Sequence, residues 1–138
     1  MKKISVLIAD DQQNFRMILS ALLRCHPDVE VVGEAVDGID VVEKTEKLNP
    51  DVVFMDITMP RCDGLDATRI LKWRWPNKKV VITSSHNQQF YRREAQRARA
   101  DGYISKSSLN AHLYAALGQG PSLLSMADDV VDVRVSST

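Results

Sequence analysis

Side chains that could carry chemistry follow four short apolar runs of the sequence, at the point where each run ends. They comprise three carboxylates, one hydroxyl and one amine: Asp10, Asp11, Asp56, Ser84 and Lys106. Carboxylates that lie close together repel one another, so a cluster of them needs a cation. Oxygen ligands alone suit a hard ion, and Mg²⁺ typically takes one or two carboxylates and keeps waters that phosphate oxygens can replace. The set therefore favours magnesium-dependent phosphoryl chemistry.

Asp56 is the member of this set that best suits a nucleophile. It follows four consecutive apolar residues and precedes Ile57, so its backbone is expected to lie near a buried sheet. A carboxylate in that position must be paired, bound to a metal or protonated. A carboxylate can attack phosphorus to form an acyl phosphate, whose oxygens then need neutralising groups. Lys106 and Ser84 could supply an ammonium group and a hydroxyl for that task.

Every residue of the set except Asp56 also has an ordinary structural explanation. Acids that follow strands often cap helices, and Asp10 or Asp11 could cap the first predicted helix. Ser84 could belong to a plain loop, and Lys106 could be solvated. The joint occurrence of complementary side chains after four runs favours a shared site over these separate explanations.

The elements that must position these side chains alternate along the chain. Short runs rich in valine and isoleucine suit parallel strands buried on both faces, and stretches with apolar residues at helical spacing follow them. We therefore predict an open, doubly wound α/β fold, (βα)5, in which sites form beyond the carboxyl ends of the strands. The predicted strands are 4–9, 29–35, 52–55, 79–83 and 102–105, and the predicted helices are 12–25, 38–49, 63–73, 88–100 and 109–117.

Two of the predicted helices carry patterns of their own. In the helix 38–49, we expect Ile39, Val42 and Leu48 to face inward. The helix 88–100 is unusually basic, and a solvated face is the favoured explanation, with partner docking the second. The arginines concerned are Arg92, Arg93, Arg97 and Arg99.

Length and composition exclude several classes of protein. The chain has 138 residues, of which 44% are hydrophobic and 26% charged, as expected for one globular domain. Lys+Arg and Asp+Glu each number 18, so the formal net charge is zero and non-specific binding to polyanions is not favoured. No apolar run approaches the roughly 18–20 residues of a membrane span. Cys25 and Cys62 form no framework, which favours a reduced, cytoplasmic protein.

The chemically active residues stand in segments that together resemble the receiver domain of two-component response regulators. The segments are 6–11, 52–60, 63–64, 82–86 and 100–106. The local sequence of these segments is most similar to that of receivers that carry a LuxR-type helix-turn-helix output domain. The resemblance implies a flavodoxin-like sheet with strand order 2-1-3-4-5. It also implies a receiver domain over 1–118 and a linker or C-terminal tail over 119–138.

The same resemblance implies a role for each residue of the set. Asp56 accepts a phosphoryl group from a phosphohistidine on a sensor histidine kinase or a phosphotransfer protein. Mg²⁺ or Mn²⁺ is held by Asp10, Asp11, Asp56 and the backbone carbonyl of Thr58, with Asp10 acting through water. Lys106 contacts the phosphoryl oxygens.

The resemblance further implies a switch. Ser84 moves to bond the phosphate, Tyr103 rotates inward behind it, and the surface of the fourth helix, fifth strand and fifth helix changes. Thr58 and His86 flank the phosphate entrance and tune the attack of water. Many relatives dimerise through this surface or through the first and fifth helices, so a homodimer is an expected assembly.

Three other functions share parts of the pattern. A phosphohydrolase resembling the haloacid dehalogenases needs an aspartate two residues after the nucleophile, where this chain has Thr58. A flavin-binding module needs a Ser/Thr-rich phosphate loop after the first strand, where Asp10 and Asp11 would repel the phosphate. A scaffold without phosphorylation needs neither the acidic set nor Ser84 and Lys106. We therefore favour a signalling switch without an external substrate.

Output functions are expected to lie outside this chain. A LuxR-type protein would continue after the receiver into a linker and a helical DNA-binding domain, and this sequence reaches only into the linker region. The chain is therefore expected to be either a single-domain regulator or a receiver excised from a longer protein. We predict that its switched surface controls an output or a partner, and we favour control of transcription through a LuxR-type domain absent here. We predict no DNA binding by this chain alone and no association with membranes.

Overall fold

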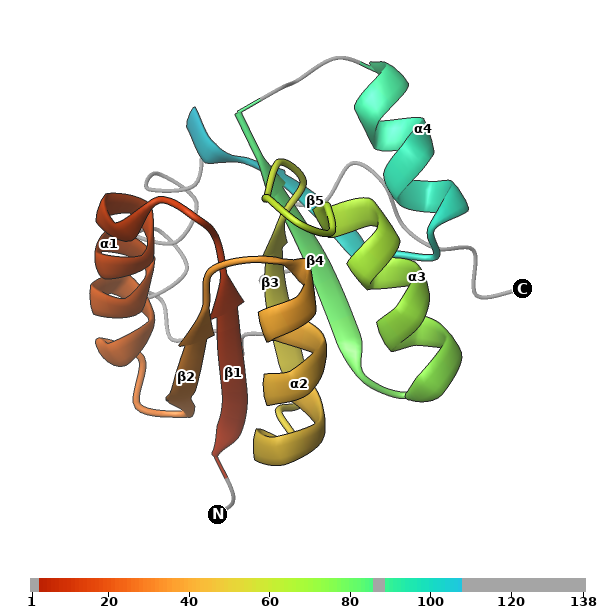
Figure 1. Ribbon diagram of the computed structural model, residues 1–138. Coiled ribbons are helices and arrows are strands. Elements are labelled where there is room, and N and C mark those ends of the chain that lie inside the picture. The colour runs from red at the N-terminus through yellow and green to blue at the C-terminus, as the bar shows by residue number, and fades with distance from the viewer. Residues whose placement is uncertain (1–2, 86–88, 108–138) are drawn as a thin grey trace.

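The chain folds as a five-stranded parallel sheet with helices on both faces (Figure 1). The computed structural model describes residues 3–85 and 89–107. The strand order is β2-β1-β3-β4-β5 and every neighbouring pair is parallel, which confirms the predicted fold and topology. The strands are β1 (Ile4–Ala9), β2 (Val29–Ala35), β3 (Val52–Asp56), β4 (Lys79–Ser84) and β5 (Gly102–Ser105). The described helices are α1 (Gln13–Arg24), α2 (Gly38–Leu48), α3 (Gly64–Arg74) and α4 (Gln89–Arg97).

The sheet separates two apolar cores, because successive side chains of a strand point to opposite faces. Helix α1 packs its buried Leu19 and Leu23 against one face. Helices α2, α3 and α4 cover the other face, where Val41, Leu71 and Ala95 are fully buried. Every residue of β3 is buried, which explains why the sequence of this central strand is an apolar run.

Parallel pairing brings the carboxyl ends of the strands to one edge of the sheet, the upper edge in Figure 1. Asp10 and Asp56 each come directly after a paired position of β1 and β3. Ser84 is paired with the last residue of β5, and Lys106 follows next. Asp56 and Ser84 are themselves the last residues of β3 and β4, so both strands extend one residue further than predicted.

Helix α2 is rotated relative to the prediction. Ile39 and Leu48, which were expected to face inward, are 41% and 36% exposed, whereas Val42 packs against the core as expected. The fully buried positions are Val41 and Thr45, one turn apart. The threonine hydroxyl donates to the carbonyl of Val41 at 2.6 Å, which satisfies it in an apolar environment. Apolar spacing alone therefore misplaced the inner face.

Helix α4 ends at Arg97, earlier than predicted, because the chain turns into a left-handed conformation at Arg99, where φ is 70°. The backbone N–H of Ala100 donates to the carbonyl of Ala95, and that of Arg99 donates to Gln96, both at 3.0 Å. These two bonds form a Schellman motif, the common way to satisfy the last carbonyls of a helix.

Some predictions fall on residues that the structure does not describe. They are the helix 109–117, the tail 119–138 and the position of His86. Within residues 3–85 and 89–107, no helix is long and apolar enough to cross a lipid bilayer.

Candidate functional site

Three aspartates meet at the carboxyl edge of the sheet. One carboxylate oxygen from each of Asp10, Asp11 and Asp56 lies within 4.8 Å of the others. Asp10 is fully buried and Asp56 is 5% exposed, whereas Asp11 is open to solvent. Two buried carboxylates at such short range raise each other's energy unless a positive charge lies between them. The structure thus brings together the acidic residues that the sequence singled out.

Lys106 supplies a positive charge to this cluster. Its Nζ lies 2.7 Å from Oδ2 of Asp10 and 3.3 Å from Oδ1 of Asp56, and its side chain is largely buried. The ammonium also sits 4.4 Å from the centroid of the Phe15 ring, close enough for a cation–π contact. Phe15 was not among the residues singled out from the sequence, where it fits the apolar spacing of α1. Its second role could not be seen from spacing, because it depends on how α1 packs beside β5.

The pKa of Asp56 is raised to about 7. Burial is the largest cause and the charge of Asp10 adds to it, whereas the charge of Lys106 acts in the opposite direction. The carboxyl group therefore changes protonation near neutral pH in the protein alone. A cation that joined the cluster would restore the ionised form that a nucleophile needs.

A small polar cavity opens beside the cluster. It has a volume of about 220 Å³, and its lining includes Asp56, Thr58, Ser85 and Lys106 together with the exposed Asp11. The cavity connects the carboxylate of Asp56 to solvent. Ser85 was not singled out from the sequence, and its neighbour Ser84 lies deeper.

The donor set fits a hard divalent cation. Asp10 Oδ2 is buried, forms an ion pair with Lys106 Nζ at 2.7 Å, and accepts no hydrogen bond from the described residues. Asp11 and Thr58 line the cavity on its open side. A buried carboxylate oxygen without a donor, next to two further carboxylates, suits Mg²⁺ or Mn²⁺.

Asp10 does not cap the first helix through a side-chain bond to its first turn. The N-cap of α1 is Gln12, which makes no side-chain capping bond, and Gln12 itself donates its backbone N–H to Oδ1 of Asp10 at 2.8 Å. Arg16 donates to the backbone carbonyl of Asp10 at 2.7 Å. These contacts hold the turn after β1 and leave Oδ2 directed to the cluster.

Ser84 and Tyr103 lie together behind the cavity. Both are 1% exposed. Burial raises the pKa of Tyr103 above its ordinary value, and a hydrogen bond with Ser84 offsets part of that rise. The guanidinium of Arg92 lies 5.0 Å from the centroid of the Tyr103 ring. The tyrosine therefore already occupies the inward position into which the family resemblance has it rotate.

Arg61 fastens the loop between β3 and α3, which carries Thr58, to the start of α2. Arg61 donates from Nε and Nη2 to the two carboxylate oxygens of Asp37, at 2.8 and 3.0 Å. Asp37 also accepts the backbone N–H of Asp40 at 2.7 Å, so it caps α2 as well. These hydrogen bonds, together with the Arg61 charge, hold the pKa of Asp37 below its usual range. Neither Asp37 nor Arg61 was singled out from the sequence, because the two residues are 24 positions apart and share no local pattern.

Glycine makes the close approach of α3 to the site possible. A Cβ on Gly64 would lie 1.9 Å from the backbone oxygen of Asp56. The backbone N–H of Gly64 donates to Ile57 at 2.7 Å. The first turn of α3 is thereby fastened directly to the end of β3, and any side chain there would push the two apart.

A doubly wound sheet with acids after β1 and β3 and a lysine after β5 is typical of receiver domains in two-component signalling. Residues 6–118 match the response regulator receiver domain, and the chain belongs to this family. It is 42% identical over 104 residues to the transcriptional regulatory protein DegU of Brevibacillus brevis, a match covering 75% of this chain and 44% of DegU. The chain thus spans less than half of that relative.

Solved receiver structures share the fold. The response regulator domain of Thermotoga maritima CheB has a TM-score of 0.76 at 32% identity, covering 94% of this chain and 96% of that one. The signal receiver domain of NarL from Mycobacterium tuberculosis has a TM-score of 0.78 at 28% identity, covering 86% of this chain and 96% of that one.

Proposed function

We propose that this receiver domain is a phosphoacceptor switch and that Asp56 is the residue phosphorylated. The observation that carries this proposal is the position of Asp56. Its carboxylate lines an open cavity, lies within reach of Asp10 and Asp11, and is paired with Lys106. The donor is a phosphohistidine on a sensor histidine kinase or on a phosphotransfer protein, as is general for the family.

In the transfer, a carboxylate oxygen of Asp56 attacks phosphorus in line with the departing histidine nitrogen. A P–O bond forms, the P–N bond breaks, and the released imidazole takes up a proton from water. Lys106 is placed to neutralise charge on the phosphoryl oxygens, because its ammonium already lies 3.3 Å from the carboxylate of Asp56. Attack of water on the acyl phosphate later returns the domain to its starting state.

Asp10, Asp11, Asp56 and the backbone carbonyl of Thr58 are the residues that would hold Mg²⁺ or Mn²⁺. When bound, the ion supplies positive charge to the phosphoryl oxygens and balances the carboxylates. The protein's own contribution is to direct Asp10 and Asp56 to one point from paired strands. Asp11 adds a carboxylate from the solvent side.

Ser84 and Tyr103 are proposed to relay the phosphorylation state to α4 and β5. A phosphoryl group on Asp56 offers new acceptor oxygens to the hydroxyl of Ser84, which now bonds Tyr103. A change in that bond alters how the tyrosine and Arg92 pack. Thr58 borders the cavity and would tune the access of water, a role that we also propose for His86.

The wider role follows from relatives such as DegU, whose name describes a transcriptional regulator. We propose that the switch controls transcription in the cytoplasm through a LuxR-type output domain, with homodimer formation as one consequence of phosphorylation. This chain alone is not proposed to bind DNA or to act on an external substrate.

Acetyl phosphate with Mg²⁺ tests the assignment of Asp56. Intact-protein mass spectrometry should show one added phosphoryl group in the wild type and none in Asp56→Asn. Asp51→Asn, at an exposed aspartate at the opposite edge of the sheet, is the matched control and should be modified normally. A mass increase that persists in Asp56→Asn would show that another residue is the acceptor.

A further inference from the structure

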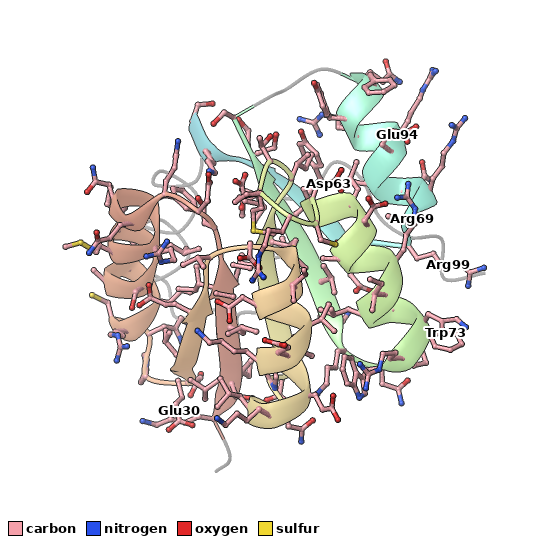
Figure 2. All side chains as sticks on the ribbon, viewed as in Figure 1. Glu30, Asp63, Arg69, Trp73, Glu94 and Arg99 are labelled. Atoms are coloured by element: carbon pink, nitrogen blue, oxygen red, sulfur yellow. The ribbon has the colours of Figure 1, made fainter. Side chains whose placement is uncertain are left out.

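A groove between the C-terminal ends of α3 and α4 lies apart from the acidic site. Its volume is about 450 Å³, and none of its lining residues lines the cavity at Asp56. Figure 2 shows Arg69 and Trp73 from α3 and Arg99 from the turn after α4 along one side of the molecule. The lining residues that matter here are Arg69, Lys72, Trp73, Arg97 and Arg99.

Trp73 is the most exposed large apolar side chain among the described residues, with 84% of its surface open to solvent. Trp75, two residues later, packs against the core and has the guanidinium of Arg74 at 4.4 Å from its ring. The fold therefore makes use of Trp75 but leaves Trp73 uncovered. Exposed tryptophans surrounded by cationic groups are enriched where proteins bind partners.

Arg99 stands where helices usually have glycine. It is the left-handed residue of the Schellman motif after α4, with φ at 70°. A non-glycine residue there carries a steric cost, and within the described part of the chain its guanidinium makes no hydrogen bond or ion pair. The backbone of Arg99 serves the helix cap, whereas its guanidinium is left to bind another molecule.

The neighbouring cations already bind carboxylates. Arg69 lies 2.7 Å from Asp66, and Arg97 lies 3.2 Å from Glu94. Both contacts are exposed, so they can exchange for carboxylates of another molecule at little cost. Lys72 is different, because its ammonium is largely buried against Asp101 at 2.9 Å and supports the wall of the groove.

We propose that this groove binds an acidic polypeptide segment, whose carboxylates pair with Arg99 and Arg97 and whose aliphatic side chain covers Trp73. A peptide fits better than a nucleic acid. Asp66 and Glu94 lie among the arginines, so a continuous phosphate backbone would run against them, and the net charge of the chain is zero. Separated carboxylates can avoid these acids.

Fluorescence anisotropy of a labelled peptide tests the proposal. The probe is an eight-residue peptide made of two Asp-Asp-Glu-Leu units. The comparison peptide has Asn in place of Asp and Gln in place of Glu. We expect saturable binding of the acidic peptide only, weakened as salt rises from about 20 to about 300 mM because screening grows. No saturable binding of the acidic peptide at low salt, or equal binding of the neutral one, would overturn the proposal.

Four variants locate the binding. Arg99→Gly removes the cation at a position that glycine prefers, so affinity should fall roughly three- to fivefold while the midpoint of urea unfolding stays or rises. Arg97→Gln should give a fall of similar size, and Trp73→Ala roughly tenfold or more. Arg24→Gln, on α1 at the other face of the sheet, is the matched control and should bind normally.

Two outcomes would contradict the location or the ligand. Normal affinity in both Trp73→Ala and Arg99→Gly would place the peptide elsewhere. Tighter binding of a labelled single-stranded oligonucleotide than of the acidic peptide would identify the groove as a nucleic-acid site instead. Asp56→Asn should bind the peptide like the wild type, so this test is independent of the phosphorylation proposal.

Discussion

The ammonium of Lys106 lies closer to Asp10 than to the proposed phosphoacceptor. Its Nζ is 2.7 Å from Oδ2 of Asp10, against 3.3 Å from Oδ1 of Asp56. One cation thus balances two buried carboxylates. Under the proposed function, a divalent ion beside Asp10 would free Lys106 to pair with a phosphoryl group on Asp56.

Replacement of Lys106 by methionine should destabilise the domain in a pH-dependent way. In the absence of divalent metal, we expect a loss of about 2–4 kcal/mol at pH 8, because two buried carboxylates are left without a cation. The loss should be smaller at pH 5, where Asp56 can take up a proton. Urea unfolding at both pH values measures this, with the exposed Lys47→Met as control. An equal loss at both pH values would contradict the shared-charge explanation.

Asp56→Asn should stabilise the metal-free protein above neutral pH. The pKa of Asp56 is about 7 in the folded protein and ordinarily 3.8, so the native state holds an extra proton between these values. Stability of the wild type therefore falls as pH rises through this window, and the cost is fully present above it. The amide removes that cost, roughly 2–4 kcal/mol at pH 8 and little at pH 4. Unfolding curves that show no gain at pH 8 would mean that burial does not raise this pKa.

Divalent metal should stabilise the wild type through Asp11. A Mg²⁺ concentration about tenfold above the dissociation constant should raise the melting temperature by a few degrees relative to EDTA. Asp11→Asn should fold normally without metal, because Asp11 is exposed, and should lose most of this rise. Asp28→Asn, at another exposed acid, should keep it. A full Mg²⁺ effect in Asp11→Asn would remove this residue from the ligand set.

Two substitutions separate the roles of Asp37. Asp37→Asn keeps a side chain that can cap α2 but removes the ion pair with Arg61, whereas Asp37→Ala removes both. We expect Asp37→Ala to be the less stable by about 1 kcal/mol, the usual value of an N-cap. Because the pKa of Asp37 is lowered, its stabilising effect is present above its ordinary pKa and is lost as pH falls through the folded value. Identical unfolding midpoints for the two variants would exclude a capping role.

Gly64→Ala should be far more damaging than Gly33→Ala. A methyl group at Gly64 meets the backbone of Asp56 at 1.9 Å, which cannot yield without moving β3 or α3. At Gly33 it meets Cδ1 of Leu48 at 2.6 Å, the end of a flexible side chain that can rotate. We expect a loss of several kcal/mol for the first and about 1 kcal/mol for the second. Comparable losses in urea would show that the α3 contact is not rigid.

The sequence alone determined the fold and the members of the acidic cluster. Apolar runs of four to six residues specify buried parallel strands, and parallel strands must present their carboxyl ends at one edge. Asp10, Asp56, Ser84 and Lys106 follow or end such strands, so their convergence was already implied by the order of the chain. The distances that join Asp10, Asp56 and Lys106 agree with that expectation.

Only the tertiary structure revealed contacts that leave no pattern in the spacing of residues along the sequence. The pairing of Arg61 with Asp37 and the position of Phe15 under Lys106 join residues far apart in the chain, so local periodicity cannot reveal them. The inner face of α2 was misread because a threonine can be buried when its hydroxyl bonds its own helix. The left-handed turn that exposes Arg99 was likewise hidden, since arginine is not the residue expected there. The alternation of apolar runs and amphipathic stretches predicts the doubly wound fold, and the family resemblance implies its strand order, whereas these contacts depend on how finished elements pack.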